Sequence, residues 1–156
     1  MKKSFQKQEI LQKIEAIRLN PEILKQEKAR RARNNFMNFI TYTKPDYQAN
    51  WHHRNLANIL DKFAKKEIKR LMVFMPPRHG KSEQTSRRLP AYIFGINPDA
   101  KIIATSYSAT LAESMSKDVQ RIIDSPTYNE LFPETTLMGS PFVKQDRKKI
   151  GYTRTN

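Results

Sequence analysis

The chain of 156 residues has about the length of one domain, and because it contains no cysteine it has no disulfide and no cysteine-ligated metal site. Its 29 Lys and Arg against 15 Asp and Glu give a formal net charge of +14, which favours a polyanion such as nucleic acid as partner. It contains neither an apolar run of about 18 residues nor an apolar core behind its basic start, so we expect neither a membrane-spanning helix nor a secretory signal peptide.

Residues 1–40 are predicted to form a basic helical arm. Ile10, Ile14 and Ile17 fall at i, i+4 and i+7, the spacing of one apolar helical stripe. Asn20 followed by Pro21 predicts the start of a second helix, because Pro is favoured at the first helical position. That helix contains a basic cluster: Lys28, Arg30, Arg31 and Arg33. A solvated charged face and a DNA-binding element both fit this cluster.

Residues 41–135 are predicted to alternate between helices and strands. After a turn near Pro45, a helix is indicated by apolar residues at i, i+3, i+4 and i+7: Leu56, Ile59, Leu60 and Phe63. The apolar run 71–75 lies between a charged pair and a proline pair. Such a run between helices is typical of a buried parallel strand.

A second strand is predicted at 101–106, after a helix over 81–94 that Pro90 should kink or end. Another amphipathic helix follows over 110–123. Because the segments alternate in this order, the sequence predicts a βαβ unit with a right-handed crossover. The expected fold is α/β: an incomplete P-loop NTPase-like parallel sheet with flanking helices. The polar, basic tail at 136–156 is expected to be disordered.

The run Met75-Pro76-Pro77-Arg78-His79-Gly80-Lys81-Ser82 is the part of the sequence that indicates a chemistry. A phosphate-binding loop needs a Gly for close backbone approach, a Lys for the β and γ phosphates, and a Ser or Thr for Mg²⁺. Gly80, Lys81 and Ser82 supply all three, although Met75 stands where the usual motif has its first Gly. Because a helix is predicted to start here, its N-terminus would face the anion.

Arg78 lies in this loop, three residues before Lys81. Its guanidinium can contact the γ-phosphate as an arginine finger supplied in cis. The other interpretation is a surface arginine paired with Glu83. His79 is expected to shape the loop or to form a hydrogen bond rather than to act as a base.

Tyr47 and Gln48 are candidates for contacting an adenine, by stacking and by hydrogen bonds to the base edge. An aromatic core residue beside a turn residue is an equally good interpretation. His52 and His53 are adjacent in a predicted helix. Since adjacent helical residues face different directions, we expect no shared metal site between them.

The chain resembles the large subunit of tailed-bacteriophage terminases. The likeness is carried by 52–83, with its Pro-Pro-Arg-His-Gly-Lys-Ser loop, and by Ser86-Arg87-Arg88-Leu89-Pro90-Ala91-Tyr92, Thr105-Ser106-Tyr107-Ser108 and Leu131-Phe132-Pro133. It covers about residues 45–135. The proline-proline entry common in that family accounts for the missing first glycine.

The resemblance implies ATP-driven packaging of double-stranded DNA into a procapsid, in the cytoplasm of a bacterial host and at the portal. It implies Lys81 and Arg78 as the catalytic residues and Ser82 as the Mg²⁺ ligand. The residues expected to contact ATP are Tyr47, Gln48, Pro77, Arg78, His79, Gly80, Lys81, Ser82 and Glu83. The implied partners are DNA, the portal protein and the small terminase subunit, and no membrane.

Hydrolysis by such a motor also needs a Walker B strand that ends in acidic residues. Nothing after residue 135 offers one, and Asp124 follows apolar residues that complete the stripe of a predicted helix. The nuclease carboxylates are absent as well. We therefore expect the front portion of a terminase large subunit. For ATP hydrolysis, the missing acidic residues would have to come from a second polypeptide.

Two other functions fit the same residues. One is a non-enzymatic, basic nucleic-acid-binding protein that keeps a vestigial phosphate loop. The other is a helicase-like P-loop ATPase, which strand separation by the complete protein would distinguish from a packaging motor.

Overall fold

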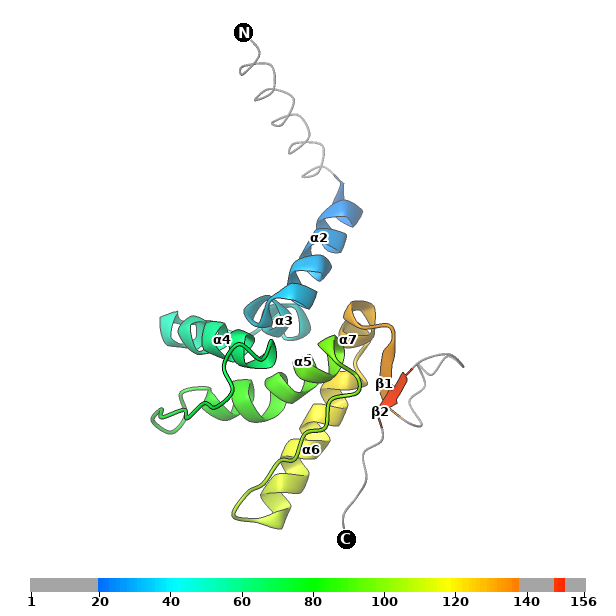
Figure 1. Ribbon diagram of the computed structural model, residues 1–156. Helices are drawn as coiled ribbons and strands as arrows, with labels where there is room; N and C mark the ends of the chain where they lie inside the picture. Colours follow the sequence, from blue (N-terminus) through cyan, green and yellow to red (C-terminus); the bar gives the residue numbers. More distant parts are fainter. Residues whose placement is uncertain (1–19, 138–147, 151–156) are drawn as a thin grey trace.

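The computed structural model describes residues 20–137 and 148–150, and these residues are mostly helical (Figure 1). The helices are α2 (Pro21–Asn34), α3 (Phe36–Thr43), α4 (Trp51–Ala64), the π-helix η1 (Glu83–Arg88), α5 (Leu89–Ile96), α6 (Ala109–Ile123) and α7 (Pro126–Leu131). Two strands, β1 (Thr135–Leu137) and β2 (Lys148–Ile150), follow. The stripe predicted at Ile10, Ile14 and Ile17 lies outside the described residues. Of the tail predicted at 136–156, residues 136–137 belong to β1 and 148–150 form β2. The rest of the tail lies outside the described residues.

The predicted parallel sheet of a P-loop NTPase is wrong for this structure. The segments 71–75 and 101–106 are not strands, and the one sheet in the described residues is the three-residue parallel pair of β1 with β2, in which Thr135 faces Lys148. A parallel strand needs neighbours in its sheet and cover on both faces. No described segment supplies a neighbouring strand to either run.

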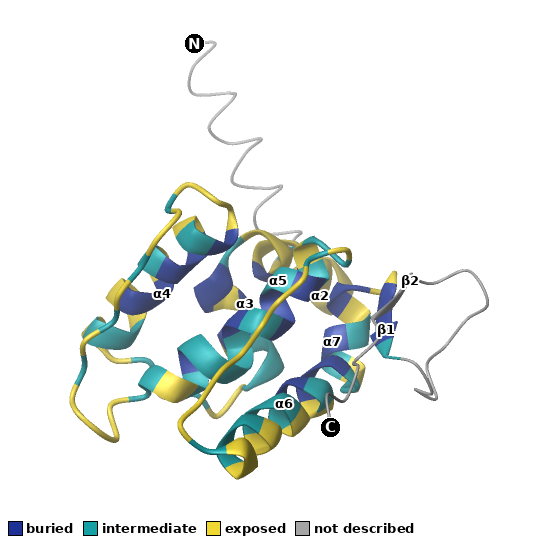
Figure 2. Ribbon diagram, turned by 60° about the horizontal axis from the view of Figure 1, so that its bottom comes forward, coloured by how far each residue is buried: buried dark blue, intermediate teal, exposed yellow. Residues whose placement is uncertain are grey.

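Both runs are nevertheless extended and only partly covered. Leu71, Val73 and Met75 pack against the core, whereas Met72 and Phe74 are 78% and 83% exposed. All residues from 101 to 107 are exposed, and Figure 2 shows this stretch crossing α5. The alternation at 71–75 is the period-two pattern of a strand with one covered face. The predicted buried strands are therefore wrong at both runs, although the covered residues of 71–75 keep the spacing of a strand with one buried face.

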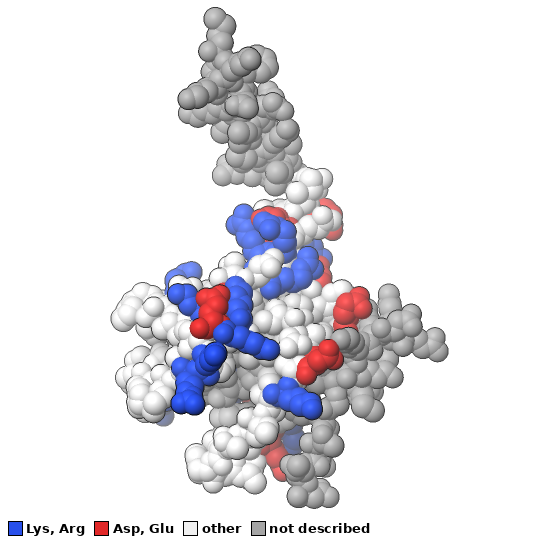
Figure 3. Space-filling model, in the orientation of Figure 1, with Lys and Arg blue, Asp and Glu red and all other residues white. Residues whose placement is uncertain are grey.

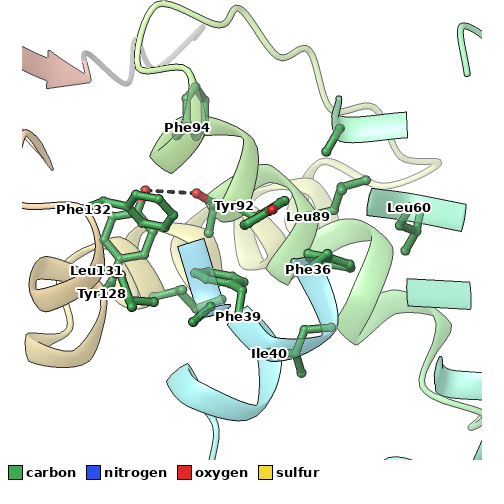
Figure 4. Close-up of a cluster of buried hydrophobic side chains, with 14 of the residues drawn as sticks. Phe36, Phe39, Ile40, Leu60, Leu89, Tyr92, Phe94, Tyr128, Leu131 and Phe132 are labelled. Atoms are coloured by element: carbon green, nitrogen blue, oxygen red, sulfur yellow. Dashed lines mark hydrogen bonds between the residues drawn. The ribbon is translucent and has the colours of Figure 1, made fainter. Parts of the chain in front are cut away.

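The core is an aromatic cluster shared by α3, α5 and α7 (Figure 4). The Tyr92 ring lies 5.3 Å from that of Phe36 and 5.2 Å from that of Phe39, between ring centroids. The Tyr128 ring lies 5.2 Å from that of Phe132, and its hydroxyl donates to the Ala91 carbonyl at 2.9 Å. Tilted aromatic pairs of this kind contribute beyond the area they bury.

A buried carboxylate, Asp61, connects α4 to its neighbours. Its Oδ1 accepts from the Phe36 backbone N–H at 2.9 Å and from the Tyr92 hydroxyl at 3.2 Å. Lys65 forms an ion pair with the other carboxylate oxygen. Burial and the adjacent carboxylate raise the pKa of Tyr92, which keeps its hydroxyl a donor.

Two predicted helix features have clear outcomes. Asn20 caps α2 by accepting from the Glu22 and Ile23 N–H groups, with Pro21 next to it, so that predicted start is confirmed. Pro90 does not end the predicted helix, which runs without a break over 81–96. The π-helical turns of η1 precede Pro90, and their wider hydrogen-bonding pattern gives room for a ring that lacks an N–H.

Among the described helices, none combines the length and the apolar composition that crossing a bilayer requires.

Candidate nucleotide-binding site

The phosphate-loop sequence forms a sharp turn between the extended run 71–75 and the helix that begins at Lys81. Arg78 and Gly80 have positive φ angles of 63° and 77°. The Gln84 N–H donates to the Gly80 carbonyl at 3.2 Å, which closes the first helical turn. The N–H groups of 81–83 precede this bond and have no carbonyl within the helix to receive them. Free N–H groups at a helix start attract an anion.

Gly80 is required by its surroundings as well as by its backbone angle. An ideal Cβ at this position would lie 2.6 Å from His53 Nε2 and 3.5 Å from Tyr47 Oη. The first distance is too short for a carbon, and the positive φ disfavours any other residue. The turn therefore packs directly on the start of α4.

A buried glutamine holds Tyr47 and α4 against the loop. Gln84 has no exposed surface, and its Nε2 donates to Tyr47 Oη at 2.9 Å and to the His53 carbonyl at 3.0 Å. Burial raises the pKa of the Tyr47 hydroxyl. Tyr47, a predicted adenine contact, thus lies beside the loop, whereas its neighbour Gln48 is an exposed residue with no described side-chain contact.

Three histidine rings gather around the loop. The His52 ring centroid lies 4.0 Å from that of His53 and 5.9 Å from that of His79. His79 Nδ1 donates to the Pro77 carbonyl at 2.8 Å, which ties two loop residues together. Within the described part of the chain no three His, Asp or Glu side chains are placed to hold a metal ion.

The ring of His53 completes a capping box at the start of α4. The Asn50 N–H donates to His53 Nδ1 at 3.1 Å, and the Asn50 side chain accepts from the helix start in return. Burial, followed by the nearby His52, lowers the pKa of His53. A neutral ring keeps Nδ1 free to accept.

The three side chains predicted to meet phosphate or metal are free of described partners. Arg78 and Ser82 are exposed and Lys81 is half-buried, and none of them forms an ion pair or side-chain hydrogen bond with a described residue. Arg78 therefore does not pair with Glu83 in this structure. A cation, a guanidinium and a hydroxyl remain available beside the free N–H groups.

Glu83, by contrast, is held by neighbouring cations. Its carboxylate accepts from Arg88 Nε at 2.9 Å and lies 3.6 Å from both Lys44 Nζ and Arg87 Nη1. Arg87 also donates to Asp118 at 2.7 Å, which lowers the pKa of that carboxyl. Glu83 thus ties the helix over 81–96 to its surroundings, and its role as an ATP contact stays a prediction.

Asp124 does not supply the missing acidic half of the site. It is the C-cap of α6, and Ile122 and Ile123 are buried in the last turn of that helix. The prediction that the residues before Asp124 complete a helix rather than a strand is confirmed. Sequence reasoning missed Gln84 as the link to Tyr47, because its position after the motif gives no sign that its amide is buried. The Asn50-to-His53 spacing was a readable capping signal.

The loop thus brings Arg78, Gly80, Lys81 and Ser82 together with Tyr47, and it leaves Gln48 and Glu83 in other surroundings. The chain was compared with protein-family models, with curated protein sequences and with solved structures. None of them matches it.

Proposed function

We propose that the chain is the ATP-binding portion of a terminase-type motor, which packages double-stranded DNA into procapsids. The observation that carries the proposal is the Gly80 turn at the start of a 16-residue helical stretch, over 81–96, with Lys81 and Ser82 free beside it. Backbone N–H groups, an ammonium and a hydroxyl are the groups that hold a magnesium nucleotide.

Each loop residue has a distinct role in this proposal. Lys81 contacts the β and γ phosphates, and Ser82 ligates Mg²⁺. Arg78 contacts the γ-phosphate, for which its exposed side chain is free. Tyr47, which Gln84 fixes beside the turn, would stack on the base. Pro77, His79 and Gly80 shape the turn, and Gln48 and Glu83 complete the proposed contacts.

Hydrolysis requires acidic residues that this loop lacks, and we propose that a second polypeptide supplies them. The backbones of 71–75 and 101–106 have no described backbone hydrogen-bond partner, and apolar side chains on both runs are exposed. A partner that covers these apolar side chains and carries carboxylates would bring the missing acidic groups to the Mg²⁺. The setting is the bacterial host cytoplasm, with DNA, the portal and the small terminase subunit as partners.

Calorimetric titration with ATP and Mg²⁺ tests the proposal. Because one charge-assisted contact contributes about 1.5–3 kcal/mol, we expect Lys81→Ala to weaken ATP binding by about tenfold or more. Lys101→Ala is the matched control, since it removes an exposed lysine outside the loop and should leave the affinity unchanged. Equal affinity of Lys81→Ala and the parent chain would refute the assignment.

The net charge of +14 supports one alternative, a basic nucleic-acid-binding protein whose loop no longer binds nucleotide. The two functions differ in one measurement. Tight duplex binding by a chain that gives no heat with ATP and Mg²⁺ would establish the alternative. ATP binding that depends on Lys81 would exclude it.

A further inference from the structure

Half of the chain's net charge comes from two segments, one along α2 and one that spans the end of α4 and the residues after it. Residues 25–33 and 61–70 contain ten Lys and Arg against three Asp and Glu. We call their basic residues the basic ridge: Lys25, Lys28, Arg30, Arg31, Arg33, Lys62, Lys65, Lys66, Lys69 and Arg70. All ten are exposed. Figure 3 shows Lys and Arg side chains gathered on one face over α2 and the end of α4.

The two segments of the ridge meet in space. Lys65 Nζ, just after α4, donates to the Asn34 carbonyl at the end of α2 at 3.0 Å. This contact brings the C-terminal ends of both helices together. A single surface therefore carries charge from residues that are more than 30 positions apart in the sequence.

The few acidic residues nearby leave most of the ridge charge free. Glu27 accepts from both Arg30 and Arg31, and Lys25 is paired with Glu130. Lys28, Lys69 and Arg70 are among the ridge residues that form no ion pair with a described residue. Such exposed, unpaired cations attract a polyanion.

Helix stability alone does not explain these positions. Cations in the last turn of a helix compensate its dipole, and that accounts for Arg31, Arg33 and Lys62. It does not account for Lys28 in the middle of α2, or for Lys69 and Arg70 beyond α4.

We propose that the basic ridge binds the phosphate backbone of a double-stranded nucleic acid without reading its sequence. The 14 residues of α2 extend about 21 Å, more than half of a helical turn of duplex DNA, which is about 34 Å, so several phosphates come within reach. Single strands are bound mainly by stacking on aromatic rings. The one aromatic residue in 25–33 and 61–70, Phe63, packs against the core.

The ridge and the phosphate loop lie at opposite ends of α4. His53, in the first turn of α4, lies against Gly80, whereas Lys65 follows the last turn. The 14 residues of α4 extend about 21 Å. The inference rests on the proposed function only for the identity of the polyanion as DNA, and each site can be tested without the other.

The experiment compares two triple variants for binding to a fluorescent duplex of about 30 base pairs, by anisotropy. Lys28→Gln/Lys69→Gln/Arg70→Gln removes three ridge charges. Lys101→Gln/Lys117→Gln/Arg121→Gln removes three exposed charges from other surfaces. Binding is measured between about 50 and 200 mM salt. The slope of log K against log salt should become shallower by about two to three in the ridge variant, and its affinity should fall about tenfold or more. The control variant should change much less in both quantities.

Equal losses in the two variants would overturn the proposal, because they would mean that only total charge matters. So would tighter binding to a single strand of the same length, or binding to phosphatidylserine vesicles and not to the duplex. Circular dichroism checks that both variants are folded. Calorimetry with ATP reports on the loop separately, so a failure of one site is distinguishable from a failure of the other.

Discussion

At the scale of single residues, Gly80 is where the loop and the helical core meet. Its φ of 77° sets the turn, and the absence of a side chain lets His53 approach. The sequence motif predicts a glycine here for phosphate access. The structure adds a second reason, because a Cβ at residue 80 would clash with the His53 ring even without a ligand.

We predict that Gly80→Ala lowers the free energy of unfolding by about 1–3 kcal/mol, with the strained φ and the contact with His53 both contributing. Denaturant unfolding of the single variants and of Gly80→Ala/His53→Ala measures the two effects. If the contact matters, the glycine change costs less when the His53 ring is already gone. The same cost in both backgrounds would show that only the backbone angle counts.

The residues of the motif were predictable because their chemistry follows from type and spacing. Gly80, Lys81 and Ser82 stand at the start of a helix, as expected. The fully buried amide of Gln84 was not predictable, because its burial depends on Tyr47 and His53, which lie more than 30 positions away. A polar residue on a helix is ordinarily expected to face solvent.

At the scale of elements, α4 connects the candidate nucleotide site to the rest of the molecule. Gln84 holds its N-terminal end against the loop by donating to the His53 carbonyl, and Asp61 fastens its last turns to α3 and α5. The helix was readable from its apolar spacing. The consequence of its histidine cap is a dependence on pH.

We predict that the protein loses stability as the pH falls below about 6.5, the ordinary pKa of histidine. The folded state lowers the pKa of His53, so the unfolded chain binds the proton first and acid favours unfolding. The stability is complete above that pH and decreases as the pH falls below it. Thermal unfolding at about pH 7.5 and 5.5 measures the loss.

His53→Gln should reduce this pH dependence, because a glutamine at the third helical position can cap without titrating. His52→Gln is the control, since His52 lies beside His53 but does not receive the Asn50 N–H. An unchanged pH dependence in His53→Gln would rule out the cap as its origin.

At the scale of the whole molecule, the sequence predicted the local structure of single helices better than the sheet that was expected to join them. The start of α2 at Asn20 and Pro21 and the place of Asp124 at the end of α6 were predictable, because they depend on neighbours in the chain. The parallel sheet was not, because 71–75 and 101–106 become strands only when other strands lie beside them. A pattern of apolar residues indicates what a segment can bury, not whether a partner is present.

The run 71–75 offers a test of this interpretation through its two sides. Met72 and Phe74 point away from the core and are mostly exposed, whereas Leu71 and Val73 pack against it. Exposed apolar patches promote association. We predict that Met72→Thr/Phe74→Thr leaves thermal stability nearly unchanged but reduces binding of the dye ANS and self-association in light scattering. Leu71→Thr/Val73→Thr, the matched control, should instead lower the free energy of unfolding by about 1–3 kcal/mol. Equal destabilisation by both variants would mean that the run is covered on both faces, as in a complete sheet.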